Sequence, residues 1–122
     1  MFKILIVEDN RTYRELLKVI IDEGKFPGVI VEEAENGKEA MEKADSFRPN
    51  LIFMDIGLPD ESGLQLTNKI KTKYPNVNVA ILTSHDELKY REAAIRYGAS
   101  HYLTKVDVTR EEIQNLVKSS LF

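Results

Sequence analysis

Short apolar segments alternate five times with amphipathic segments along this chain. The first, third and fourth apolar segments are nearly continuous runs, which is typical of parallel strands covered on both faces. The segments between them carry apolar residues at helical spacing, such as Leu17, Ile20 and Ile21 in the first. The strands predicted from this pattern are Lys3–Val7, Val29–Ala34, Leu51–Asp55, Val77–Thr83 and His101–Thr104.

Local signals mark where the predicted helices begin and end. A Ser, Thr or Asn followed three residues later by Glu has the spacing of a capping box, which favours a helix start. Helix-breaking residues stand near the expected ends, at Gly24, Pro49, Pro75 and Gly98. The predicted capping boxes are Asn36 with Glu39, Ser84 with Glu87, and Thr109 with Glu112. The predicted apolar helix positions are Leu16, Leu17, Ile20 and Ile21, then Ala40, Met41, Ala44 and Phe47, then Leu66, Ile70 and Tyr74, then Ala93, Ala94 and Tyr97, and finally Ile113, Leu116 and Val117.

The strict alternation of strands and helices predicts an α/β fold, with a doubly wound five-stranded parallel sheet and helices on both faces. The chain has 122 residues, which is enough for one hydrophobic core but not for two. No repeat, low-complexity segment or linker interrupts the alternation. We therefore expect residues 1–122 to form a single domain.

Charged and hydroxyl-bearing residues stand at or just beyond the carboxyl ends of the predicted strands. Doubly wound sheets bind their ligands outside this edge, where the strand order reverses. Because adjacent strands are about 4.8 Å apart, acids from the first and third strands can meet only if those strands are neighbours. The residues at this edge are Glu8 and Asp9 after the first strand, Asp55 at the end of the third, Thr83 at the end of the fourth and Lys105 after the fifth.

Three carboxylates at one edge repel one another unless a cation lies between them. An all-oxygen ligand set suits Mg²⁺ or Mn²⁺, and Mg²⁺ keeps waters and accepts phosphate oxygens. Asp55 is then a candidate nucleophile for an acyl phosphate, with Thr83 and Lys105 as phosphate contacts. Simpler interpretations stay open at this point, since a carboxylate also caps a helix or a loop and a lysine is often a solvated charge.

Composition narrows the class of protein. The net charge is -3 and no basic run is present, which argues against nucleic-acid or membrane-surface binding by this chain. The absence of cysteine excludes disulfides and thiolate chemistry and suits the reducing cytoplasm. The apolar runs are too short to span a membrane, and the N-terminus leads into a strand without a cleavable signal. The two histidines, His85 and His101, have no partner at metal-ligand spacing and are predicted to be structural or exposed.

Five motifs in register carry a resemblance to a known family. They are Glu8-Asp9, Asp55, the turn LPDESG, LTS at Leu82–Ser84, and GASHYLTK ending at Lys105. Together they resemble the receiver domain of two-component response regulators, of the chemotaxis type, over essentially the whole chain. The resemblance implies a flavodoxin-like sheet with strand order 2-1-3-4-5, so that the first and third strands are neighbours.

The resemblance implies a role for each residue of the carboxyl edge. Asp55 is expected to be the phosphoacceptor. The metal ion, Mg²⁺ or Mn²⁺, is expected to bind Glu8, Asp9, Asp55 and the backbone carbonyl of Gly57.

The same resemblance assigns the phosphate contacts and a switch. Lys105 and the hydroxyl of Thr83 are expected to contact phosphoryl oxygens. Tyr102 matches the family's aromatic switch position, so movement of Thr83 toward the phosphate is expected to let Tyr102 turn inward.

The resemblance also implies partners. The phosphoryl donor is expected to be a phosphohistidine on a sensor histidine kinase or a phosphotransfer protein. The face built from the fourth helix, fifth strand and fifth helix is expected to control an output domain or partner, and to be the face of any homodimer. The chain is therefore expected to be a signalling domain that assists its own phosphotransfer and autodephosphorylation, and not an enzyme in the ordinary sense.

The chain departs from the family pattern at two positions. Val106 follows Lys105, where the family often has a proline in a cis bond, so we predict a trans bond here. Gly57 offers no side chain to shield a phosphoryl group, so we expect a moderately short-lived acyl phosphate.

The residues disfavour three other functions. A Mg²⁺-dependent aspartyl phosphohydrolase typically needs a second Asp at the position of Gly57. A nucleotide-binding flavodoxin-like domain needs a phosphate loop after the first strand, yet VEDNRT has no glycine and two acids. An interaction module without chemistry would not require Asp55, Thr83 and Lys105 together.

Overall fold

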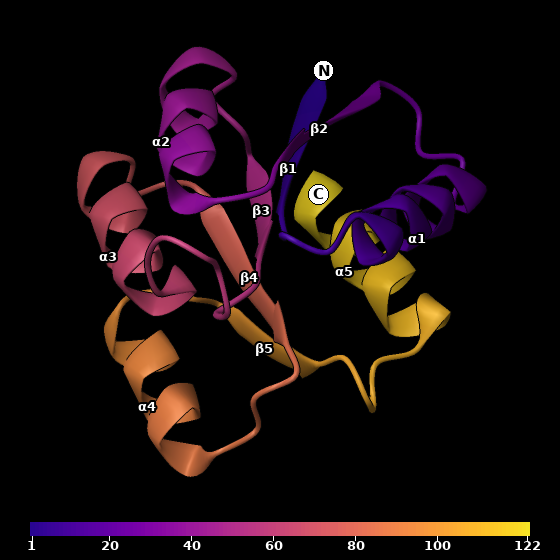
Figure 1. The fold of residues 1–122 in the computed structure, drawn as a ribbon. Coiled ribbons are helices and arrows are strands. Elements are labelled where there is room, and N and C mark those ends of the chain that lie inside the picture. The colour runs from indigo at the N-terminus through magenta and orange to yellow at the C-terminus, as the bar shows by residue number, and fades with distance from the viewer.

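Buried apolar runs form the strands of this protein, and amphipathic segments form the helices between them. The computed structural model describes all 122 residues, with five strands and five helices in strict alternation (Figure 1). In chain order the elements are β1 (Phe2–Val7), α1 (Arg11–Glu23), β2 (Val29–Ala34), α2 (Gly37–Ser46), β3 (Leu51–Met54), α3 (Gly63–Lys73), β4 (Asn78–Thr83), α4 (Leu88–Arg96), β5 (His101–Thr104) and α5 (Arg110–Leu121).

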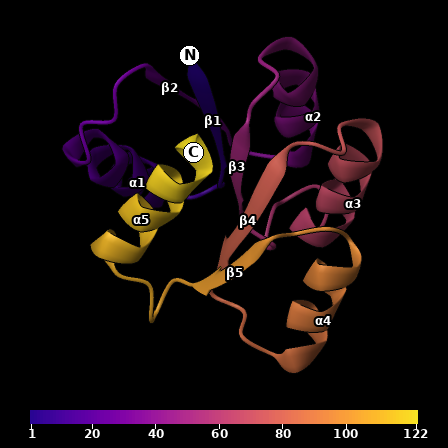
Figure 2. The ribbon, with the colours of Figure 1, turned by 180° about the vertical axis from the view of Figure 1, so that it is seen from behind.

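The five strands form one parallel sheet in the order β2-β1-β3-β4-β5, as predicted. Helices α1 and α5 cover one face, and α2, α3 and α4 cover the other (Figures 1 and 2). The order reverses between β1 and β3, because the chain first moves outward to β2 and then returns to the other side of β1. Ligand sites of doubly wound sheets lie at such a reversal.

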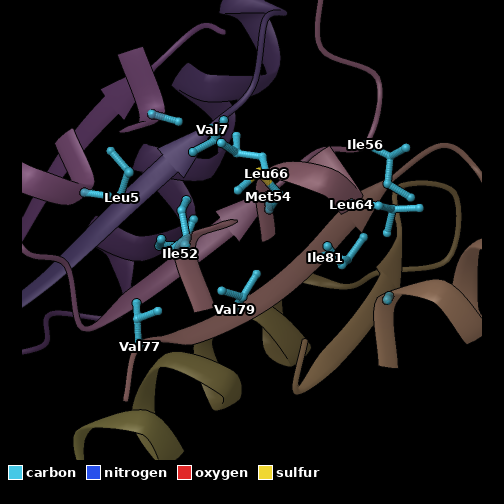
Figure 3. Close-up of a cluster of buried hydrophobic side chains, with 14 of the residues drawn as sticks. Leu5, Val7, Ile52, Met54, Ile56, Leu64, Leu66, Val77, Val79 and Ile81 are labelled. Carbon is cyan, nitrogen blue, oxygen red and sulfur yellow. The ribbon is translucent and has the colours of Figure 1, made fainter. Parts of the chain in front are cut away.

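Each face of the sheet has its own hydrophobic core. Because side chains alternate along a strand, Leu5 and Val7 of β1 pack toward α2 and α3, whereas Ile4 and Ile6 pack toward α1 and α5. Figure 3 shows the first of these cores, in which side chains from β1, β3, β4 and α3 meet. Its labelled members are Leu5, Val7, Ile52, Met54, Ile56, Leu64, Leu66, Val77, Val79 and Ile81.

Side-chain caps fix the beginnings of four helices. The predicted caps at Asn36 and Thr109 are confirmed, because their side chains accept hydrogen bonds from the amides of Glu39 and Glu112. Asn10 and Ser62 also cap α1 and α3 with their side chains, although neither is followed three residues later by Glu.

The predicted capping box of Ser84 and Glu87 is wrong. Helix α4 begins only at Leu88, and its cap residue Glu87 makes no side-chain cap hydrogen bond. The segment before α4 is not helical, and its backbone makes a tertiary hydrogen bond instead. The hydroxyl of Tyr102 in β5 donates to the carbonyl of His85. The hydrogen bond from the Tyr102 hydroxyl therefore competes with the local helix signal here.

Smaller differences separate prediction and structure. The bounds of β1, β3 and β4 shift by one residue, so Asp55 lies just after β3 instead of inside it. Leu16 was predicted on the apolar face of α1 but is 41% exposed, whereas Leu17 is buried. None of the helices has the length and apolar character needed to cross a membrane.

Gly63, the first residue of α3, packs directly against the end of β3, and its amide donates to the carbonyl of Ile56. A Cβ at this position would lie 1.9 Å from the carbonyl oxygen of Asp55. Gly63→Ala is therefore expected to lower the free energy of unfolding by about 3 kcal/mol, measured by urea titration. Gly57→Ala is the control, expected within about 0.5 kcal/mol of wild type, since the added Cβ has no neighbour closer than 3.9 Å. Equal stability of both variants would contradict this packing.

Candidate functional site

The backbone register of the sheet sets the position of three charged residues. The amide of Glu8 donates to the carbonyl of Ala34 at 3.0 Å, and the amide of Asp55 donates to Val7 at 3.0 Å. Strand pairing thus continues one residue past β1 and β3, and because Val7 pairs with Met54, Glu8 and Asp55 leave the sheet side by side. On the other side, the amide of Lys105 donates to Thr83 at 2.8 Å, which carries Lys105 to the same edge.

The three predicted acids come together at this edge. One carboxylate oxygen from each of Glu8, Asp9 and Asp55 lies within 4.8 Å of the other two. Glu8 and Asp55 are buried, at 2% and 7% exposure, whereas Asp9 is exposed and lies on the solvent side. An oxygen cluster with two buried members and one open side fits Mg²⁺ or Mn²⁺, which bind few carboxylates and retain waters.

Lys105 is the positive group inside this acid cluster. Its Nζ lies 2.6 Å from Oε1 of Glu8 and 3.1 Å from Oδ2 of Asp55. The ring of Tyr13, in the first turn of α1, lies beside the ammonium at 4.5 Å from the ring centroid. The Lys105–Val106 bond is trans, as predicted. One ammonium against three carboxylates leaves the cluster short of positive charge, which is the electrostatic condition for a cation site.

Burial and ion pairing oppose each other at Glu8. Burial raises the pKa of Glu8 and the charge of Asp55 adds to the increase, while hydrogen bonds from Lys105 and from the amide of Asn10 partly counteract both. Burial alone would lower the pKa of Lys105, but its contacts with the two carboxylates raise it overall. Lys105 therefore stays protonated, and the raised pKa of Glu8 favours its protonated form as the pH falls.

The loop after Asp55 is held at both ends. The amide of Gly57 faces Oδ1 of Asp55 at 3.4 Å, and Gly57 forms an isolated bridge with Ser62. Further along, both carboxylate oxygens of Asp60 accept hydrogen bonds from the first amides of α2, those of Gly37 at 2.8 Å and Lys38 at 3.0 Å. The pKa of Asp60 is lowered, first by its bond from Gly37. The predicted metal ligand Gly57 thus lies in a loop clamped to the start of α2.

The backbone of one residue, His85, connects the two predicted switch residues. The amide of His85 donates to the hydroxyl of Thr83 at 3.4 Å, and its carbonyl accepts from the hydroxyl of Tyr102 at 2.7 Å. Thr83 is fully buried and Tyr102 half-buried, with the guanidinium of Arg91 4.8 Å from the centre of the Tyr102 ring. Burial raises the pKa of Tyr102 to about 12, so the hydroxyl remains a donor.

The sequence prediction missed several residues of the site. Three residues that follow the acid pair contact groups of the site. The ring of Tyr13 lies beside the ammonium of Lys105, the amide of Asn10 donates to the carboxylate of Glu8, and Arg14 donates to the backbone carbonyl of Glu8. His85 was predicted to be structural or exposed; its side chain is 44% exposed, and its Nε2 lies 3.9 Å from where a Cβ of Gly57 would stand. His101 is exposed and lies outside the cluster.

The fold and the site define a class of α/β domain with an acid cluster, a lysine and a buried threonine at the carboxyl edge of its sheet. The chain belongs to the response regulator receiver domain family, which it matches over residues 4–118. It is thus a receiver domain of the kind found in two-component response regulators.

Individual relatives agree with this assignment. The chain is 37% identical over 121 residues to the transcriptional regulatory protein YdfI of Bacillus subtilis, covering 99% of this chain and 55% of YdfI. It is 35% identical over 104 residues to the transcriptional regulatory protein DegU of Brevibacillus brevis, covering 84% of this chain and 43% of DegU. The chain therefore spans about half the length of these relatives.

Solved structures confirm the fold. A CheY-like response regulator receiver domain protein from Methanospirillum hungatei superposes with a TM-score of 0.89 at 28% identity, covering 99% of this chain and 94% of that one. A two-component response regulator from Clostridium difficile gives a TM-score of 0.89 at 29% identity, covering 99% and 96%.

Removal of the Lys105 charge tests the electrostatics of the cluster. In EDTA, Lys105→Met is expected to lower the free energy of unfolding by about 2 kcal/mol at neutral pH, because it leaves the buried carboxylates unpaired. The pKa of Glu8 is raised on folding, so its proton favours the folded state and that contribution is lost as the pH rises. The deficit of the variant should therefore shrink as the pH falls toward the ordinary Glu value of 4.5.

Urea titrations at several pH values measure this deficit. Lys69→Met is the control, because it removes a lysine whose side chain is 58% exposed and paired with Glu61. A deficit of Lys105→Met that is the same at every pH would contradict the charge balance described here.

Proposed function

We propose that this domain accepts a phosphoryl group on Asp55 from a phosphohistidine, with Mg²⁺ or Mn²⁺ held by Glu8, Asp9, Asp55 and the carbonyl of Gly57. The observation that carries the proposal is the convergence of three carboxylates within 4.8 Å at the edge where Lys105 binds Asp55. Membership of the receiver family supports the same assignment.

The reaction needs a carboxylate oxygen, charge neutralisation and alignment. When bound, the metal ion supplies positive charge to the carboxylates and to the incoming phosphoryl group. An oxygen of Asp55 forms a bond to phosphorus while the bond from phosphorus to the donor imidazole breaks, and the imidazole leaves with the electron pair. Asp55 suits this role because it is held by the strand register, with an amide near one oxygen and an ammonium near the other.

Lys105 and Thr83 complete the phosphoryl site in this proposal. Lys105 already lies 3.1 Å from Asp55 and is free to contact a phosphoryl oxygen once the acyl phosphate forms. Thr83 carries a buried hydroxyl at the end of β4, which can donate a hydrogen bond to another phosphoryl oxygen. The transfer adds negative charge at Asp55, so both donors gain a stronger acceptor.

The signal leaves the site through the backbone of His85. A Thr83 hydroxyl that turns to the phosphate gives up its contact with the amide of His85, and the carbonyl of the same residue holds Tyr102. Phosphorylation thereby shifts the equilibrium between two arrangements of Tyr102 and of the face formed by α4, β5 and α5. We assign to this face the contact with an output domain or partner, and any homodimer.

The partners follow from the chemistry. A sensor histidine kinase or a phosphotransfer protein supplies the phosphohistidine, and a cytoplasmic location is part of the proposal. Because YdfI and DegU are transcriptional regulatory proteins about twice as long, we propose an output in transcription, exerted by a part outside these 122 residues.

Loss of the phosphoryl group is part of the same chemistry. Gly57 leaves the approach to Asp55 open to water, so the domain assists autodephosphorylation and its acyl phosphate is short-lived. An aspartyl phosphohydrolase is the alternative, and it is disfavoured because Gly57 stands where such an enzyme needs a second carboxylate.

Incubation with acetyl phosphate and Mg²⁺ tests the proposal, with the intact mass as the readout. Wild type is expected to gain one phosphoryl group, because acetyl phosphate offers a reactive phosphoryl donor without a kinase. Asp55→Asn is expected to gain none, and removal of the metal with EDTA is expected to abolish the gain in wild type.

Asp107→Asn is the matched control, because Asp107 lies two residues after Lys105 and bonds to Thr104 outside the acid cluster. It should be phosphorylated like wild type. Phosphorylation that persists in Asp55→Asn would refute the assignment, and steady turnover of unrelated phosphoesters would favour the hydrolase.

A further inference from the structure

Arg14 of α1 is a nearly buried basic residue beside the acid pair, and the function described so far leaves it without a role. Its side chain is 11% exposed. Its Nη1 donates to the backbone carbonyl of Glu8 at 2.7 Å, and its Nε donates to Oε1 of Glu33 at 3.0 Å. Arg14 therefore connects α1, β2 and the turn that carries the acids.

Glu33 holds the guanidinium in one orientation. Its second oxygen accepts from Nζ of Lys18 at 3.0 Å. Burial alone would raise the pKa of Glu33, but the bonds from Lys18 and Arg14 lower it overall, so the carboxylate is ionised. A planar guanidinium with two fixed acceptors has little freedom, which suits it to holding a third group in place.

The carbonyl that Arg14 holds belongs to the peptide between Glu8 and Asp9. In an extended strand, consecutive side chains point to opposite faces. Glu8 and Asp9 are consecutive, yet an oxygen of each lies within 4.8 Å of the other and of Asp55. The chain must therefore turn at this peptide, and the orientation of the peptide decides whether both acids reach one site.

We propose that Arg14 is a positioning residue for the metal site: by fixing the carbonyl of Glu8, it holds Glu8 and Asp9 in the convergent arrangement that binds a divalent cation. This inference rests on the proposed function, because it needs these acids to be metal ligands. Groups that orient metal ligands without touching the metal typically change the affinity 10- to 100-fold when removed.

The test measures Mg²⁺ affinity by calorimetry on the folded domain, with Mg²⁺ alone as the titrant. Arg14→Met keeps most of the apolar stem but removes every donor, and it is expected to weaken Mg²⁺ binding about tenfold. Glu33→Gln keeps the shape of the orienting residue while weakening its hold on the guanidinium, and it is expected to give a smaller loss. If Arg14→Met does not fold by circular dichroism, the result for Glu33→Gln decides.

Arg11→Met is the matched control for charge. Arg11 lies on the same helix and nearer the acids in sequence, but it is exposed and its side chain makes no hydrogen bond or ion pair. Its loss is expected to change the Mg²⁺ affinity less than twofold. Equal weakening in Arg11→Met and Arg14→Met would overturn positioning in favour of a general charge effect.

Two further outcomes separate this inference from the proposed function. Asp9→Asn removes a proposed ligand; if it leaves the Mg²⁺ affinity unchanged, the metal site itself fails. If Asp9→Asn weakens binding but Arg14→Met and Glu33→Gln do not, only the positioning role fails.

At saturating Mg²⁺ the rate of phosphorylation by acetyl phosphate in Arg14→Met should return to within about twofold of wild type, because Arg14 acts through the acids. A rate that stays low at saturation would contradict the inference.

Discussion

The parallel pairing of β1 with β3 is the constraint on which the rest of this structure depends. Val7 pairs with Met54, and the amide of Asp55 still donates to Val7, so Glu8 and Asp55 leave the sheet as neighbours. Apolar burial on both faces of these strands keeps the register, since a slip of one residue would move every side chain of the strand into the core on the opposite face. The energy that places two acids side by side therefore comes from the hydrophobic core, while the acids themselves oppose the arrangement.

The site holds buried carboxylates that repel one another, and the surrounding structure keeps them together. Glu8 is almost fully buried, and that burial raises its pKa. Lys105 is the one ammonium that pairs with Glu8 and Asp55. A sequence optimised for stability alone would not bury two carboxylates with a single lysine. Such a deficit of positive charge is useful where a cation binds, because the cation finds its carboxylates already in place. The charge of a bound cation would then offset the repulsion between the carboxylates and an incoming phosphoryl group.

The sequence predicted the fold further than it predicted the site. Apolar periodicity was enough for five strands and five helices, but the strand order came from family resemblance, since spacing alone does not say that β1 and β3 are neighbours. Among the acids, Asp9, Asp55 and Glu8 were found because they end buried strands. Tyr13 and Arg14 were missed because their roles arise from contacts through space that no linear motif encodes. The helix start at Ser84 was wrongly predicted because a tertiary bond from Tyr102 competes with the local cap.

Paramagnetic broadening by Mn²⁺ tests the central claim most directly, because it reports where a divalent cation sits without requiring any reaction. In the amide spectrum of the folded domain, substoichiometric Mn²⁺ should selectively broaden the signals of Glu8, Asp9, Asp55 and Gly57, and excess Mg²⁺ should restore them. Broadening centred instead on the acidic segment from Glu32 to Glu39, with the amide of Asp55 unaffected, would contradict the account.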